Sequence, residues 1–187
     1  MEQGKVARIL ITRKCTRKCS YCCNNYTKIM QHGMPLTRFE NLSGYKEYCL
    51  TGGEPLLEHT LTETLAKRIK ENFPCTKTWL YTSLYEPALC ILLRKGFIDG
   101  VHYTIHQKTT EEDILNFGVF QSCLQYFPGA SFRLYIHKDS VANINIIPSL
   151  WNRIEIKKWS TEKELLSRKP KGLPIGEDLF FLSPEFR

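Results

Sequence analysis

The sequence has no long hydrophobic run and no leader pattern. Among its 187 residues, no apolar stretch approaches the roughly 20 residues that a membrane helix requires. Residues 1–6 are polar and lead directly into a short apolar stretch, so the basic, apolar and small-residue segments of a signal peptide are missing. Low-complexity segments and interdomain linkers are missing too. We therefore expect a single-domain cytoplasmic protein with no membrane partner.

The cysteines lack the distribution of a disulfide framework. Cys15, Cys19 and Cys22 fall within eight residues of one another, while most of the other cysteines are scattered singly in apolar contexts. This distribution favours a metal site plus buried thiols, because disulfide-rich chains space their cysteines across the whole fold. The scattered cysteines, expected to pack in the core, are Cys49, Cys75, Cys90 and Cys123.

Acidic residues are the minority charge. Lys and Arg number 26 against 19 Asp and Glu, and the net charge of +7 favours anionic partners without establishing nucleic-acid binding. Arg13, Lys14, Arg17 and Lys18 surround the clustered cysteines, where cations would offset the charge of a thiolate-ligated metal centre. A second basic group at 157–171 is interpreted as a solvated surface.

Short runs rich in β-branched and aromatic residues recur along the chain, with room for a helix between most of them. They lie at 6–12, 46–51, 77–82, 101–106, 132–137 and 153–158. This alternation predicts an α/β fold with a parallel sheet, in the form of a partial (β/α)6 barrel similar to a TIM barrel. A barrel of eight strands would need a longer chain. Loops at the carboxyl ends of the strands are expected to carry the chemistry.

Three helices are predicted between these strands. Thr60 and Glu63 have the spacing of a capping box before a series of apolar residues that repeats every four positions. The segment 85–95 has a proline in its first turn and a glycine after its end. Thr109 and Glu112 repeat the capping-box spacing before a third apolar series.

Residues 1–158 are predicted to form the core domain and residues 159–187 a C-terminal tail. Prolines and glycines interrupt the tail, which is therefore predicted to be irregular. Apolar residues near its end predict that it packs against the barrel. Trp151 and Trp159 lie among basic residues at this junction, which leaves stacking on nucleic-acid bases open, although packing is favoured.

The clustered cysteines follow the first predicted strand, so one loop can hold one metal centre. Thiolates select zinc or iron–sulfur clusters, and structural zinc takes four closed ligands. Only three cysteines are suitably placed, because Cys23 directly follows Cys22 and adjacent residues rarely point at one centre. A cluster held by three cysteines leaves one iron free to bind a small molecule.

Two motifs resemble those of the radical S-adenosylmethionine (SAM) superfamily. The stretch CTRKCSYC at 15–22 resembles its CxxxCxxC signature, including the aromatic Tyr21 before the third cysteine. The stretch TGGEP at 51–55 resembles its GGEP motif at the end of the second strand. Two features of the family are missing: a GxIxGxxE-like segment, whose region is occupied by residues 141–146, and an extra C-terminal cluster domain.

The resemblance implies a [4Fe-4S] cluster and SAM as cofactors, with SAM chelating the iron that has no protein ligand. The implied iron ligands are Cys15, Cys19 and Cys22, and the implied SAM contacts are Tyr21, Gly52, Gly53, Glu54, Thr82, Ser83, Thr104 and His106. The last four match the family only by position, and turn or barrel-lining hydrogen bonds are an equal alternative. The resemblance assigns no catalytic side chain. It implies reductive cleavage of SAM to a 5′-deoxyadenosyl radical that abstracts hydrogen from a substrate.

Two substrates and one non-enzymatic function remain open. An activase of the anaerobic ribonucleotide reductase type would act on a protein, and a synthase of the 7-carboxy-7-deazaguanine type on a small anionic pterin. No carboxylate follows the third cysteine to hold the synthase's magnesium, since residues 23–25 are CNN. His106 and His137 end predicted strands and could carry protons or bind substrate. A reduced flavodoxin or ferredoxin is the implied partner, and a non-catalytic zinc or iron–sulfur protein is the alternative.

Overall fold

The computed structural model describes residues 5–17, 19–140, 143–169, 171–183 and 186. Within these residues, eight parallel strands form one open sheet in the order β2-β8-β1-β3-β4-β5-β6-β7. The strands are β1 (Val6–Thr12), β2 (Met34–Leu36), β3 (Glu47–Gly52), β4 (Lys77–Thr82), β5 (Gly100–Ile105), β6 (Ser131–His137), β7 (Arg153–Lys157) and β8 (Glu177–Leu182). The α-helices are α1 (Thr27–Met30), α2 (His59–Asn72), α3 (Pro87–Arg94), α4 (Glu111–Cys123) and α5 (Glu162–Arg168).

The predicted α/β class, the parallel sheet and the partial barrel are confirmed. The limit of six strands is wrong, because β2 has only three residues and the described part of the β6–β7 connection holds no α-helix. A chain of this length can therefore form eight strands, because not every pair of strands is joined by a crossover helix. The predicted irregular tail is also wrong in two places, since it contains α5 and β8. β8 pairs with β1 and β2 inside the sheet.

The three predicted helices are present, but both predicted capping boxes are wrong. At α2, the 3-10 helix Pro55–Glu58 runs straight into the α-helix, so no side chain caps its start. At α4, the box is one residue later than predicted and joins Thr110 to Asp113. This shift matters for the site, because it places Asp113 rather than Glu112 at the buried side of the first turn.

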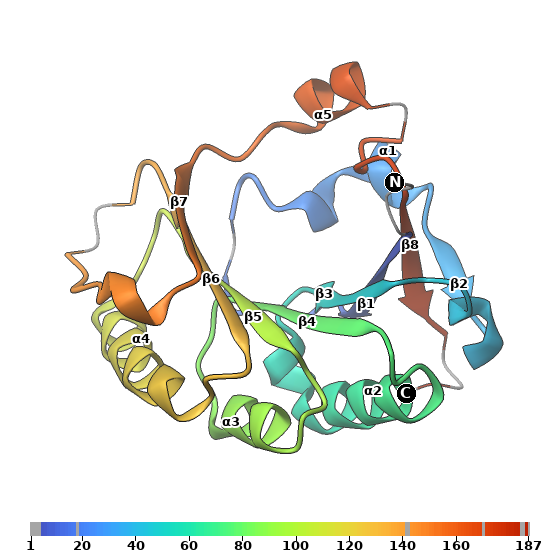
Figure 1. Ribbon diagram of the computed structural model, residues 1–187. Helices are drawn as coiled ribbons and strands as arrows, with labels where there is room; N and C mark the ends of the chain where they lie inside the picture. Colours follow the sequence, from blue (N-terminus) through green and yellow to red (C-terminus); the bar gives the residue numbers. More distant parts are fainter. Residues whose placement is uncertain (1–4, 18, 141–142, 170, 184–185, 187) are drawn as a thin grey trace.

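Helices α2, α3 and α4 cover the outer face of the sheet, and the segment that carries α5 runs from β7 to β8 on the other side (Figure 1). Strand side chains alternate between the two faces. Those that point outward pack with the helices in a core that includes Leu50, Leu65, Ile69, Leu80, Leu89, Leu92, Val101, Phe117, Phe120 and Leu134. Trp151 belongs to this core, as expected, with its ring stacked on Phe117 at 5.8 Å.

The inner face of the sheet, here called the lumen, is polar and aromatic. The Arg8 guanidinium lies 5.2 Å from the Tyr81 ring and forms an ion pair with Glu177. The ring of His102 lies 4.2 Å from the Tyr81 ring and 5.6 Å from that of Tyr135. Buried charge of this kind needs partners, and the arginine has them.

Several residues discussed above, Lys18, Val141, Ala142, Pro170 and Pro184, lie outside the described residues. Among the helices of the described part, none is both long and apolar enough to cross a membrane.

Candidate functional site

The cysteine loop leaves the carboxyl end of β1 and wraps back on itself. The amide of Cys22 donates to the carbonyl of Cys19 at 3.2 Å, and the amide of Asn25 donates to that of Cys22 at 3.0 Å. These turns bring Cys15, Cys19 and Cys22 to the wall of one cavity of about 360 Å³. The three thiols predicted as ligands thus face a common space.

The GGEP segment holds the stem of this loop through its backbone. The amide of Gly53 donates to the carbonyl of Thr12 at 2.6 Å, and that of Glu54 to the carbonyl of Lys14 at 2.7 Å. A Cβ at Gly53 would collide with the Lys14 carbonyl, and one at Gly52, whose φ is +131°, would lie 2.5 Å from the Thr12 oxygen. The two glycines are therefore required by the close approach of the chain itself.

Glu54 is buried and joins the ends of β3 and β4. Its Oε1 accepts from the Thr82 hydroxyl at 2.7 Å and the Leu56 amide at 3.2 Å. Its Oε2 accepts from the amide and the hydroxyl of Ser83, at 2.9 and 3.2 Å. Burial is the main cause that raises the pKa of Glu54, and these donors oppose it. They occupy the roughly four acceptor positions of a carboxylate.

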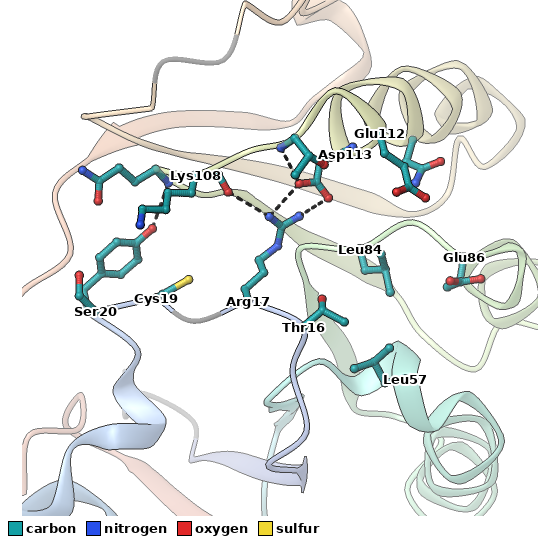
Figure 2. A pocket seen from close by; sticks show the side chains of 14 residues that line it. Thr16, Arg17, Cys19, Ser20, Leu57, Leu84, Glu86, Lys108, Glu112 and Asp113 are labelled. Carbon is teal, nitrogen blue, oxygen red and sulfur yellow. Dashed lines mark hydrogen bonds and ion pairs between the residues drawn. The ribbon is translucent and has the colours of Figure 1, made fainter.

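Arg17 ties the cysteine loop to the far side of the site, where its guanidinium reaches Asp113 and the Lys108 carbonyl (Figure 2). Its Nη2 donates to Asp113 Oδ1 at 2.6 Å and to the Ser83 carbonyl at 3.0 Å. Its Nε donates to the Ser83 hydroxyl at 2.9 Å. Burial raises the pKa of Asp113, but the Thr110 amide and Arg17 outweigh it, so this pKa lies below its usual value.

We call Arg17, Glu54, Thr82, Ser83 and Asp113 the rim network. Its hydrogen bonds run without a break from the cysteine loop through β4 to the start of α4. From its position beside the cysteines, Arg17 is expected to offset the charge of the metal centre. In the structure its charge is already paired, with side-chain exposures of 14% for Arg17 and 18% for Asp113.

Aromatic rings line the other wall of the site. The Tyr21 ring stacks on that of His137 at 4.4 Å, and His137 stacks in turn on Trp159 at 5.2 Å. The Tyr21 hydroxyl lies 3.1 Å from His106 Nδ1, and the same nitrogen lies 3.5 Å from the Cys19 sulfur. Burial, followed by nearby Arg17 and His137, lowers the pKa of His106 to about 4. This imidazole is therefore neutral at pH 7.

A cavity of about 160 Å³ is lined by every residue that the resemblance implies as an iron ligand or a SAM contact, but not by His137. The implied residues are Cys15, Cys19, Cys22, Tyr21, Gly52, Gly53, Glu54, Thr82, Ser83, Thr104 and His106. The cavity also contains residues that sequence reasoning missed, notably Tyr81 and Trp159. Tyr81 directly precedes a selected threonine, so strand position could have indicated it. Trp159 was expected to pack, and its place in the cavity could not be predicted because only the crossing of the tail brings it here.

A second cavity, of about 570 Å³, lies beside this one and shares Arg17, Cys19 and Tyr21 with it. Figure 2 shows this second cavity between the cysteine loop, the loop after β4 and the start of α4. Its wall carries the exposed carboxylates of Glu86 and Glu112.

The thiols fit a shared cationic centre. Burial is the main cause that raises the pKa of Cys15 and Cys19, and the charge of the neighbouring Cys22 thiolate raises both further. Three close thiolates therefore need positive charge between them, which iron supplies. No group of three or more His, Cys, Asp or Glu side chains among the described residues is placed to hold a single metal ion. In a cluster each cysteine bonds a different iron, so its ligands stand farther apart than those around one ion.

The fold and the site define an open (β/α) barrel with a three-cysteine metal loop after its first strand. The model of the family described as "4Fe-4S single cluster domain" matches residues 3–112. The chain belongs to this family, and its cofactor is a [4Fe-4S] cluster. No curated protein matches the sequence.

Solved structures of BtrN resemble the fold. The structure of BtrN in complex with AdoMet and 2-DOIA has a TM-score of 0.51 and 20% sequence identity, over 75% of this chain and 59% of BtrN. An open conformation of selenomethionine BtrN has a TM-score of 0.43 and 22% identity, over 60% and 56% of the two chains. The chain thus spans less than two thirds of BtrN. At these identities the likeness shows the fold alone.

Proposed function

We propose that the chain is a radical SAM enzyme. The observation that carries this proposal is one cavity that joins the three cysteines to the Gly52–Glu54 segment and the ends of β4 and β5. BtrN, which has a similar fold, binds AdoMet in its solved complex. With both cofactors bound, the reduced cluster would supply one electron to the sulfonium of SAM, and this reductive cleavage would yield methionine and a 5′-deoxyadenosyl radical.

The protein's own residues hold and enclose the cofactors in this proposal. Cys15, Cys19 and Cys22 bind iron. Tyr21 and Trp159 provide flat apolar faces against which an adenine ring can stack. These rings exclude water from the cavity, where a carbon radical would otherwise be exposed to side reactions.

In this proposal Glu54 positions other side chains and does not itself contact SAM. Because its acceptor positions are occupied by protein donors, it orients Thr82 and Ser83 toward the cavity. A ligand amino group that bonded to Glu54 would have to replace one of these donors. We therefore propose Glu54 as a positioning residue and Thr82, Ser83 and Thr104 as the polar contacts, alongside neutral His106.

The experiment is anaerobic reconstitution with iron and sulfide, reduction, and measurement of 5′-deoxyadenosine formed from SAM. The Cys22→Ala variant should lose at least about 100-fold in product and most of its iron, because three thiolates are needed to hold the cluster. The matched control is Cys23→Ser, which removes the adjacent thiol at the same cavity and should retain both. Wild-type protein that binds the cluster without forming 5′-deoxyadenosine would indicate a non-catalytic iron–sulfur protein.

For the substrate, we propose a protein, in an activase of the anaerobic ribonucleotide reductase type. The cavity beside Cys19 presents the exposed carboxylates of Glu86 and Glu112 against one lysine, Lys108. That balance disfavours a small anionic substrate. The edge strands β2 and β7 lie at opposite ends of the sheet order, so the barrel is open on one side. Because the segment that carries α5 crosses this opening between β7 and β8 (Figure 1), we propose that a protein segment approaches over the cavity beside Cys19 instead.

The alternative is a 7-carboxy-7-deazaguanine synthase-like reaction on a small anionic pterin. Electron paramagnetic resonance of the reduced enzyme mixed with SAM and a glycyl-radical protein tests the first, because a glycyl radical gives a characteristic doublet. Ring-contracted product from the pterin, with no doublet, would support the second. We propose reduced flavodoxin or ferredoxin as the electron donor in either case.

A further inference from the structure

Three reactive side chains converge on the outer side of the barrel, away from the cysteine loop. Tyr85 lies in the loop after β4, Cys90 in α3, and Cys123 at the last residue of α4. The Tyr85 hydroxyl is 3.8 Å from the Cys90 sulfur and 3.9 Å from the Cys123 sulfur. Both sulfurs therefore lie against the same hydroxyl group, and both line one surface cavity. Two cysteines far apart in sequence thus form a dithiol pair.

The pair is accessible, which the sequence analysis did not expect. Cys90 and Cys123 are half-buried and line a surface cavity of about 470 Å³. The other scattered cysteines lie apart from this cavity: Cys49 is buried, as expected, and Cys75 is exposed, contrary to expectation. The cavity also contains Arg94, a cation that can stabilise a thiolate during exchange.

We propose that Cys90 and Cys123 form a redox-active dithiol that closes to a disulfide with a small-molecule disulfide, of the glutathione disulfide class, as the oxidant. One thiolate attacks a sulfur of the oxidant, forms a mixed disulfide and releases the first small thiol. The second cysteine attacks the protein sulfur of that mixed disulfide and releases the second small thiol. Two electrons and two protons pass from the pair to the oxidant, and the protein sulfurs become bonded.

The geometry suits this closure. A disulfide requires its two sulfurs at about 2.05 Å, and side-chain rotation away from the Tyr85 hydroxyl that both sulfurs contact would bring them together. The bond would link α3 to α4, the helices that follow the two strands whose ends carry Ser83 and Thr104. Burial raises the pKa of Cys90, and Arg94 opposes it. The exchange is therefore expected to accelerate as the pH rises toward 9.

The experiment titrates the anaerobically reconstituted full chain with mixtures of oxidised and reduced glutathione. Free thiols are alkylated at each point, and peptides are identified by mass spectrometry. The expected result is a linked Cys90–Cys123 peptide, with both thiols protected at the same midpoint while the visible absorption of the cluster is retained. The linked protein should melt roughly 5 to 10 °C higher than the reduced protein, because the bond closes a long loop.

Two variants distinguish this from non-specific oxidation. Cys90→Ser should convert Cys123 to a mixed disulfide with glutathione and abolish the rise in melting temperature. Cys75→Ser, at the exposed and isolated cysteine, should change neither the midpoint nor the melting temperature. The inference is overturned if Cys90 and Cys123 oxidise at different midpoints as separate mixed disulfides. It is equally overturned if the linked peptide forms only after the cluster absorption is lost.

Discussion

The rim of the barrel and the middle of its lumen differ in whether their polar side chains have hydrogen-bond partners. At the rim, the guanidinium of Arg17 and the carboxylate of Glu54 have their hydrogen-bonding groups partnered. In the lumen, both ring nitrogens of the buried His102 lack a partner among the described residues. A partnered group is fixed in position, whereas an unpartnered one costs stability. The hydrogen bonds at the rim therefore fix the side chains around the site, whereas the unpartnered His102 in the lumen lowers the stability of the fold.

Among substitutions at the rim, Gly53→Ala should lower the stability of the protein most. The new Cβ would collide with the Lys14 backbone carbonyl, which cannot move without breaking its bond from the Glu54 amide. We expect a loss of at least about 3 kcal/mol in the free energy of unfolding, measured in urea. Gly118→Ala is the matched control, because no atom lies within 4 Å of its Cβ and it is inside α4. It should stabilise by roughly 0.5 to 1 kcal/mol. Equal effects at the two glycines would contradict the packing argument.

Asp113→Ala should break the rim network between Arg17 and the start of α4, where both carboxylate oxygens accept from the guanidinium. It leaves the partly buried Arg17 guanidinium without its carboxylate, at a cost of about 2 to 3 kcal/mol. The cysteine loop should loosen as well, so iron should pass to a chelator several times faster. Glu112→Ala removes the adjacent exposed carboxylate and should change stability by less than about 0.5 kcal/mol. If both variants release iron at the wild-type rate, Arg17 does not position the loop.

His102→Phe should remove the cost in stability of the unpartnered imidazole in the lumen. Burial, followed by Arg133 and Arg8, lowers the pKa of His102 from 6.5 to about 3. Between these values the unfolded chain binds a proton that the folded chain does not, so the wild type loses about 1.4 kcal/mol for each pH unit as the pH falls below 6.5. Urea unfolding at pH 6.5 and 5.5 should show a smaller loss for the variant. An unchanged pH slope would show that His102 is protonated in the fold.

Trp159→Ala should have the smallest effect on stability, about 1 kcal/mol or less, because its stacking on His137 is at the edge of the fold. Its effect should appear in binding: if it covers SAM, the dissociation constant should rise roughly fivefold, about 1 kcal/mol, in equilibrium dialysis of the holo-protein. Trp159→Phe retains a flat ring and should bind nearly as well as the wild type. Unchanged affinity in the alanine variant would place the cofactor elsewhere.

Much of the site could be predicted because its residues sit at strand ends. Parallel strands bring their carboxyl ends to one edge, so Cys15 after β1, Glu54 after β3 and Ser83 after β4 had to meet once the strands were recognised. The two extra strands were missed for local reasons. β2 has three residues, and β8 lies in a tail whose prolines and glycines favoured an irregular prediction.

What could not be predicted depends on contacts between distant segments. The partner of Arg17 was decided by a capping box one residue later than the sequence suggested, which turned Asp113 toward the loop. Cys90 and Cys123 looked like two separate core thiols, because nothing local shows that α3 and α4 bring both to the Tyr85 hydroxyl and to one cavity.

The sequence by itself determined the strand rhythm, the parallel sheet and the metal-binding loop, because periodicity, turn residues and ligand spacing act over short stretches of chain. The tertiary structure alone decided how charges pair across the rim, why Gly52 and Gly53 must lack a side chain, and how Trp159 reaches the cavity. Those outcomes depend on distances between segments far apart in the chain, and only the folded packing sets such distances.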